Sequence, residues 1–281
     1  MSKEKILEKS FLLIAFSSIG ILALIAFFIF EQGVPLIWKV GPGSFLLGER
    51  WFPSRGSFGI FPMIVGSFWV TLGALIVGVP LGVACAVFLC ELTPPAVSTV
   101  FRPTIQLLAA IPSVIYGFWG LIVLVPLIRI HLGGPGLSVL AGSLVLGIMI
   151  LPTIISISED ALRALPRTFK EGALSLGATH WQTIWRVLLP AARSGIVASV
   201  ILGMGRAIGE TMAMIMILGN AVQMPHSILS SARTLTTNIG IEMGYATGDH
   251  RQALFATGVV LFFIIMGLNT LAMFVSGKRR T

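Results

Sequence analysis

The chain has 281 residues, of which 56% are hydrophobic and 11% are charged, and its formal charge at neutral pH is +8. A soluble globular domain usually carries about 25% charged residues, so this composition excludes an ordinary water-soluble fold. The basic residues are scattered between apolar blocks and form no solvated stripe with interleaved aromatic residues, which excludes a nucleic-acid surface as the origin of the charge.

Six apolar blocks are long enough to cross a hydrocarbon core of roughly 30 Å as helices. The expected spans are Phe11–Phe30, Ile60–Leu89, Thr104–Ile128, Gly136–Ile157, Gly195–Leu218 and Ala253–Ser276. The first block is longer than the core of a signal peptide and lacks a clear cleavage site, so we expect it to be retained. The sequence therefore predicts an all-α transmembrane protein with about six membrane-spanning helices.

The distribution of basic residues predicts the topology. With the N-terminus inside, cytoplasmic segments hold twelve Lys or Arg residues and external loops hold six, while Arg206 lies within a span. This excess follows the positive-inside rule and places both termini in the cytoplasm. We expect an N-terminal part at 1–59 with the first span and an external loop, a transmembrane core at 60–276, and a basic cytoplasmic tail at 277–281. Another long external loop is expected at 220–252.

The cytoplasmic loop at 158–193 has the pattern of two short helices. Gly177 is well placed as a left-handed cap of the first helix, and Thr179 and Gln182 have capping-box spacing at the start of the second. In the second helix, an amphipathic stripe suits the membrane interface. The stripe consists of Trp181, Ile184, Trp185 and Leu188. We expect the second helix to lie on the bilayer and the first to project.

This loop resembles the EAA loop of bacterial ABC importer permeases. The resemblance is carried by Glu171, Gly172 and Ala173, then Gly177, then Leu189 and Pro190, with the full spacing of that signature. Gly172 replaces an alanine, which loosens a helix by roughly 0.5–1 kcal/mol. The resemblance implies that the first helix fits a groove on a cytoplasmic ATPase and couples its closure to the spans. The alternative is an ordinary amphipathic connector.

Signs of catalysis are missing from the sequence. It has no Gly-rich phosphate-binding loop that ends in Gly-Lys-Ser or Gly-Lys-Thr, so we expect ATP hydrolysis on another subunit and no enzymatic activity here. We expect no cofactor and no metal site. The four histidines, which are scattered over loops, are expected at the surface: His131, His180, His226 and His250. Cys85 and Cys90 lie in one apolar block and are expected to face lipid or to pack.

Arg206 and Glu210 are ionisable residues inside the fifth expected span. Their spacing of four places them on one face of a continuous helix. A charge at the membrane centre costs roughly 2.5–3.5 kcal/mol even on lenient insertion scales, so such residues usually face a bundle interior or an aqueous route. A guanidinium suits bidentate contact with an oxyanion. The alternative is a salt bridge that joins helices.

Two segments resemble the permeases of phosphate ABC importers. They are Gly205–Ala213 and Ala109–Gly120, and Met212-Ala213 is closer to PstC-type than to PstA-type permeases. The resemblance implies a type I (MetI-like) permease in the bacterial inner membrane, paired with a PstA-like permease, a PstB-like ATPase dimer and a PstS-like phosphate-binding protein.

By the same resemblance, Arg206 and Glu210 match intramembrane positions associated with phosphate passage. Ser113 and Tyr116 are weaker candidates, because their hydroxyls either donate to phosphate beside a kink at Pro112 or bond to nearby backbone. Three alternatives remain open: a permease for molybdate or sulfate, a self-contained secondary transporter, and a membrane scaffold or sensor.

Overall fold

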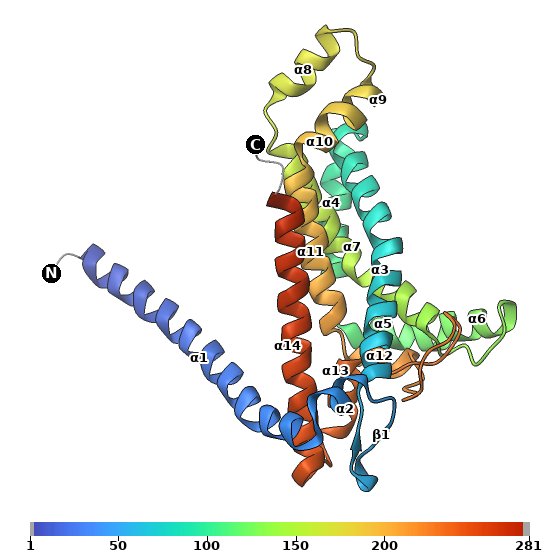
Figure 1. The fold of residues 1–281 in the computed structure, drawn as a ribbon. Coiled ribbons are helices and arrows are strands. Elements are labelled where there is room, and N and C mark those ends of the chain that lie inside the picture. Colours follow the sequence, from blue (N-terminus) through green and yellow to red (C-terminus); the bar gives the residue numbers. More distant parts are fainter. Residues whose placement is uncertain (1–2, 278–281) are drawn as a thin grey trace.

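The apolar blocks of the sequence form long helices because a helix satisfies its own backbone hydrogen bonds where water is absent. The computed structural model describes residues 3–277, so residues 278–281 of the expected basic tail lie outside the described residues. Figure 1 shows most of the long helices side by side, with α8 at one end of the bundle and α13 at the other. We refer to these as the α8 end and the α13 end.

The long helices are α1 (Lys3–Val40), α3 (Phe61–Val87), α4 (Pro95–Ala110), α7 (Val139–Arg163), α11 (Arg193–Gly209) and α14 (Gly248–Gly277). The shorter helices are α2 (Pro42–Leu47), α5 (Ser113–Trp119), α6 (Val125–His131), α8 (Arg167–Ser175), α9 (His180–Thr183), α10 (Leu189–Ala191), α12 (Met212–Ile217) and α13 (Leu235–Glu242). The π-helical segments are η2 (Phe88–Leu92), η3 (Gly120–Leu124) and η4 (Ile184–Leu188), and η1 (Pro53–Arg55) is a 3₁₀ turn. Strands β1 (Trp51–Phe52) and β2 (Ser57–Phe58) form an antiparallel hairpin, in which Trp51 pairs with Phe58.

By length and composition, five described helical segments are apolar enough to cross a membrane. They are Leu7–Val40, Phe61–Leu92, Ser113–His131, Val139–Arg163 and Gly248–Thr270. A sixth arises if His180–Ala191 and Arg193–Gly209, which are bent by 68°, form one broken span. The prediction of an all-α transmembrane protein with about six spans is confirmed.

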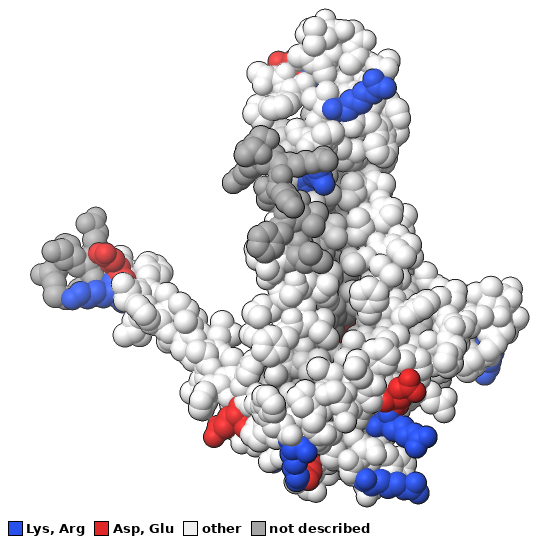
Figure 2. All heavy atoms as spheres, in the orientation of Figure 1, with Lys and Arg blue, Asp and Glu red and all other residues white. Residues whose placement is uncertain are grey.

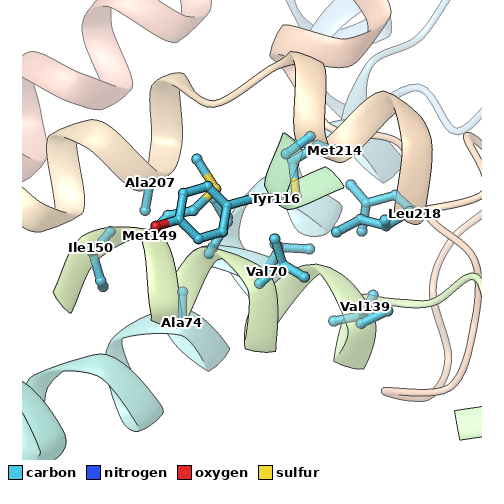
Figure 3. Packing of buried hydrophobic residues seen from close by; sticks show 14 of the residues in the cluster. Val70, Ala74, Tyr116, Val139, Met149, Ile150, Ala207, Met214 and Leu218 are labelled. Atoms are coloured by element: carbon cyan, nitrogen blue, oxygen red, sulfur yellow. The ribbon is translucent and has the colours of Figure 1, made fainter. Parts of the chain in front are cut away.

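Helix α7 lies at the centre of the main hydrophobic core. It packs along α3, and Val70 and Ala74 of α3 belong to one buried cluster with Met149 and Ile150 of α7. Figure 3 shows these residues together with Tyr116 of α5. On the face in Figure 2, charged side chains gather at the two ends of the bundle and at the tip of α1, and the side of the bundle is almost entirely uncharged. This band matches the hydrocarbon layer of a membrane.

Helix α1 leaves the bundle diagonally (Figure 1) and packs against α14 only near its own C-terminal half. Phe28 contacts the ring of Phe255, and Phe30 contacts those of Phe262 and Phe263. The most apolar window of α1 is 0% buried within this chain. Its surface is therefore available to lipid or to another membrane subunit.

The expectation of long loops at 31–59 and 220–252 is wrong in part. Helix α1 continues to Val40, because residues after Glu31 keep a helical apolar face and Leu36 is fully buried. The hairpin and α2 fill the rest of the first loop. Helix α13 and the first turn of α14 lie within the second. A shared apolar cluster, including Phe45, Trp51 and Leu235, joins the two segments.

The third expected span, Thr104–Ile128, is not one helix. Helix α4 ends at Ala110, Ile111 is extended with ψ 126°, and α5 begins at Ser113. Pro112 explains the break, because proline lacks an N–H group and disfavours the helical conformation of the residue before it. The kink expected at Pro112 is therefore confirmed, and it separates two helices.

Candidate functional site

Two interrupted helices meet inside the bundle. One interruption lies between α4 and α5, and the other lies between α11, which ends at Gly209, and α12, which begins at Met212. Helices α5 and α12 pack together where Gly117 faces Ala213. A Cβ atom at Gly117 would lie 2.8 Å from Cα of Ala213, so glycine is what permits this approach. Both interruptions are thereby held close to one another.

The second interruption corrects the prediction that Arg206 and Glu210 share one helix face. Glu210 is extended, with ψ 131°, and follows the last residue of α11. Its Oε1 accepts a hydrogen bond of 3.1 Å from the backbone nitrogen of Ala213, in the first turn of α12. A carboxylate there offsets the free N–H groups of a helix start, which is why the chain starts a new helix and does not continue the old one.

Thr236 of α13 stabilises the same interruption. Its Oγ1 donates a hydrogen bond of 2.9 Å to the backbone oxygen of Glu210, a group that has lost its place in a continuous helix. The break therefore has hydrogen-bond partners for both a freed donor and a freed acceptor. The fold therefore stabilises this interruption by specific hydrogen bonds.

Arg206 lies in the last turn of α11 and is exposed on the surface of this chain. None of the ion pairs found within residues 3–277 joins Arg206 to Glu210 or to another carboxylate. The internal salt bridge that the sequence allowed is thus not formed.

The two hydroxyl candidates lie at the first interruption and differ from each other. The hydroxyl of Tyr116 donates a hydrogen bond of 2.9 Å to the backbone oxygen of Leu108, across the break at Pro112. This is the backbone alternative that the sequence left open for it. Tyr116 and Ala207, which is next to Arg206 in sequence, belong to the same buried cluster (Figure 3). Ser113 begins α5 and is half-buried, and its hydroxyl makes no hydrogen bond with a described residue.

The predicted coupling segment stands apart from the bundle. Helix α8 carries Glu171, Gly172 and Ala173 and has no buried residue, and it projects from the end of the bundle in Figure 1. Gly177 has φ +83°, and its amide nitrogen bonds to the oxygen of Leu174, so the left-handed cap is confirmed. Helix α8 is tied back by Lys170, whose Nζ lies 2.6 Å from Oε2 of Glu91 in η2.

The second helix of this segment starts with the predicted capping box of Thr179 and Gln182. The expected single amphipathic stripe is divided, however, because its aliphatic and aromatic members face different surroundings. Ile184 and Leu188 are buried in a cluster with α3 and α7, whereas Trp181 and Trp185 are exposed and stack edge to face. Leu189 and Pro190 lie at the 68° bend that leads into α11.

Two buried carboxylates escaped the sequence analysis, and each has one partner that is distant in the chain: Arg102 for Glu159 and Trp51 for Glu242. Glu159 of α7 binds Arg102 of α4 and Arg163, with the shortest N–O distance 2.6 Å. Glu242 of α13 binds Arg233 and His250. His250 was expected at the surface, but 18% of its side chain is exposed. For each carboxylate, a charged residue in an apolar part of the sequence could have indicated a buried ion pair.

The two cysteines are free and half-buried, as packing residues are expected to be. No group of three or more His, Cys, Asp or Glu residues is arranged to hold a metal ion within residues 3–277. The chemistry available at the interrupted helices is therefore that of a guanidinium, a carboxylate and two hydroxyls.

Comparison with known proteins decides the family. Residues 78–277 match the family model described as the binding-protein-dependent transport system inner membrane component. The chain belongs to this family. It is 44% identical over 250 residues to the probable ABC transporter permease protein YqgH of Bacillus subtilis, with 87% of this chain and 81% of that protein covered. It is 40% identical over 243 residues to the phosphate transport system permease protein PstC of Haemophilus influenzae, with 79% and 77% covered.

Solved structures show the same fold at low sequence identity. A chain of the MetNI methionine ABC transporter aligns with a TM-score of 0.59 at 21% identity, covering 78% of this chain and 94% of that one. A chain of a bacterial alginate ABC transporter aligns with a TM-score of 0.64 at 16% identity, covering 99% of both. The predicted MetI-like permease fold is confirmed. The chain is a multi-pass inner-membrane permease subunit of an ABC importer complex.

Proposed function

We propose that the chain is the permease subunit of an ATP-driven phosphate importer and forms half of the translocation pathway. The proposal rests mainly on Arg206, which lies beside two interrupted helices. Its guanidinium is exposed and has no ion-pair partner among the described residues. A charge at membrane depth that faces lipid is strongly unfavourable. We therefore expect Arg206 to face an aqueous path that a second subunit closes. Several relatives of 35–40% identity are named phosphate permeases, which supports phosphate as the substrate.

Arg206 and Glu210 have complementary roles in this proposal. The guanidinium supplies a planar set of donors that matches two oxygens of a tetrahedral anion. The Glu210 carboxylate lies at the neighbouring break, and repulsion from it keeps the anion from binding so tightly that it cannot leave. Ser113 is placed to add a neutral hydroxyl donor, and Tyr116 holds the α4–α5 break by its bond to Leu108. Selective passage follows from weak contacts at several groups.

The remaining parts supply energy and delivery. A PstA-like permease forms the other half of the pathway, a PstB-like ATPase dimer hydrolyses ATP, and a PstS-like protein delivers phosphate. With both termini cytoplasmic, the α8 end faces the cytoplasm and the α13 end faces outward. Residues 60–276 then form the transmembrane core, residues 1–59 precede it, and 277–281 is the cytoplasmic tail.

Helix α8 is the ATPase contact in this arrangement. Glu171, Gly172 and Ala173 are placed on the projecting helix, Gly177 ends it, and Leu189 with Pro190 leads its motion into α11. In this proposal, movement of α8 is also transmitted to η2 and α3, through the ion pair of Lys170 with Glu91.

Uptake of radiolabelled phosphate by vesicles that contain the complete importer tests the proposal. Arg206→Ala is expected to lower uptake at least tenfold, since a hydrogen bond to a charged group contributes about 1.5–3 kcal/mol. Arg206→Lys keeps the charge without the planar fork and is expected to restore little. Arg129→Ala removes an exposed guanidinium from α6 and is the matched control. Normal uptake by Arg206→Ala in an assembled complex would refute the role of Arg206.

Competition separates the rival substrates. Arsenate is expected to compete with phosphate, whereas stronger competition by sulfate or molybdate would assign the permease to one of those anions. Removal of the ATPase subunit is expected to abolish uptake. Persistent uptake would instead identify a secondary transporter.

A further inference from the structure

Glu242 is a nearly buried carboxylate that joins three separate parts of the chain at the α13 end. Its side chain is 9% exposed. Oε1 accepts a hydrogen bond of 2.6 Å from Nη1 of Arg233. Oε2 accepts one of 2.9 Å from Nε1 of Trp51 in β1, and lies 2.7 Å from Nε2 of His250 in α14. The hairpin, the segment before α13 and the start of α14 therefore converge on this one carboxylate.

The surroundings of Glu242 hold it in place. Arg233, whose side chain is 12% exposed, also donates to the backbone oxygen of Asn220 and to Oδ1 of Asn238. The guanidinium thus balances the charge of the carboxylate while it binds one further segment, at Asn220, and a second residue of α13, Asn238. Breaking a buried ion pair is strongly unfavourable, because it leaves a buried charge without its partner. The four segments are expected to move together.

The other end of the same helix reaches the interrupted span. Thr236, in the first turn of α13, donates to the backbone oxygen of Glu210. Later in α13, a Cβ atom at Gly240 would lie 2.7 Å from the methyl group of Thr211, so α13 packs directly against the break. Helix α13 is thus bonded at its start to the site and at its end to the hairpin.

The hairpin presents an outer face to solvent. Trp51 points inward and is 6% exposed, whereas its neighbour Phe52 is 50% exposed. The guanidinium of Arg55 lies 5.0 Å from the centre of the Phe52 ring. An exposed aromatic residue with an arginine over it is the composition typical of a protein contact. The hairpin thus carries this exposed face on one residue and the bond to Glu242 on the neighbouring residue, Trp51.

We propose that Glu242 is a positioning residue for transport, and that α13 is a strut that links the hairpin to the break at Glu210. In this proposal the phosphate-binding protein docks on the hairpin and shifts α13, and α13 shifts the Glu210 carbonyl and the start of α12. The proposal rests on the proposed function, because it places the hairpin on the outward face. It adds a mechanical route from that face to the pathway.

Hydrogen exchange of the assembled importer tests the strut without any substrate. Trp51→Phe keeps the ring packing and removes the N–H donor to Glu242. It is expected to speed deuterium uptake in peptides that cover residues 207–218 at least threefold, because a hydrogen bond to a charged group contributes about 1.5–3 kcal/mol and part of this loss reaches the break. Trp38→Phe, at a residue of α1 that is 74% exposed, is the control and should leave these peptides unchanged. Faster exchange confined to the hairpin would overturn the proposal.

Stimulation of ATP hydrolysis by the phosphate-loaded binding protein gives a second test. Thr236→Val removes the hydroxyl that binds the Glu210 carbonyl, and Thr257→Val is its control, because Thr257 is buried in α14 and bonds only to Ala253 of its own helix. Trp51→Phe and Thr236→Val are each expected to lower stimulation about threefold while basal hydrolysis is kept, as for the loss of one hydrogen bond.

The double variant separates a strut from two unrelated contacts. If α13 transmits one motion, the double variant is stimulated as much as the more impaired of the two single variants, and no less. Additive losses, or a parallel fall in basal hydrolysis, would overturn the proposal. Failure of the proposed function appears differently, as absent phosphate uptake by the unaltered importer, and leaves the exchange experiment readable.

Discussion

Gly117 is the residue on which the meeting of the two interrupted helices depends. A Cβ atom there would lie 2.8 Å from Cα of Ala213 and 3.0 Å from Sδ of Met216. Gly117→Ala is therefore expected to destabilise the subunit by about 1–3 kcal/mol, as overpacking does. A lower unfolding temperature and reduced uptake would report this change.

Gly267→Ala is the control for that substitution, since a Cβ atom at Gly267 meets nothing within 4 Å. The two variants differ only in the space available to one methyl group. Equal unfolding temperatures would show that the α5–α12 approach is looser than the structure indicates.

Arg206 and Glu210 show what residue chemistry can and cannot predict. The rarity of charge in an apolar span was enough to select both residues. Their geometry was not predictable, because whether a helix continues past Gly209 depends in part on a residue elsewhere in the chain. The Glu210 carboxylate bonds to the nearby amide of Ala213, but the Glu210 carbonyl bonds to the hydroxyl of Thr236, 26 residues away.

At the scale of elements, α8 offers a pair of identical substitutions with opposite expected effects. Gly177 has φ +83°, where a side chain costs roughly 1–2 kcal/mol. Gly172 is helical, and a Cβ atom there meets nothing within 4 Å, so alanine should stabilise the helix by roughly 0.5–1 kcal/mol. Gly177→Ala is expected to weaken ATPase binding and uptake, and Gly172→Ala is expected to preserve both.

Co-purification of the ATPase with each variant, together with ATP-driven uptake, measures this pair. Loss of ATPase binding in both variants would mean that the ATPase approaches Gly172 so closely that a methyl group there blocks the contact. Normal binding in both would show that the cap at Gly177 does not position α8.

The elements themselves were predictable to different degrees. Hydrophobic length predicted the long helices, and Pro112 predicted one break through its own covalent structure. The capping signals of Gly177 and Thr179 predicted the form of the α8 end. Helix α13 and the hairpin were missed, because they are short and are stabilised by an apolar cluster and by the bond of Glu242 to Trp51, which is 191 residues away.

At the scale of the whole molecule, the exposed surface has two kinds of region. Residues 11–30 of α1 are mostly exposed and carry no charge, whereas the region around Arg206 carries a charge. In the assembled importer, lipid or subunit contacts are expected over the first and water is expected at the second. Only a thiol in water reacts with a charged methanethiosulfonate reagent.

Cysteine labelling measures this difference. In a chain with Cys85 and Cys90 replaced by serine, Arg206→Cys is expected to be labelled in the assembled importer. Leu22→Cys, at a position of α1 that is 67% exposed in the isolated chain, is expected to stay unlabelled. Protection at position 206 together with labelling at position 22 would reverse the assignment of the two regions.

The unpaired guanidinium of Arg206 also bears on how cells make this protein. A copy inserted into the bilayer without its companion subunit would leave that charge against lipid, at roughly 2.5–3.5 kcal/mol on insertion scales. Such an orphan is expected to be short-lived, because membrane proteases act on poorly stabilised chains. The abundance of this subunit is therefore expected to follow the synthesis of its companion. The charge of Arg206 would in this way help to keep the two subunits in equal amounts.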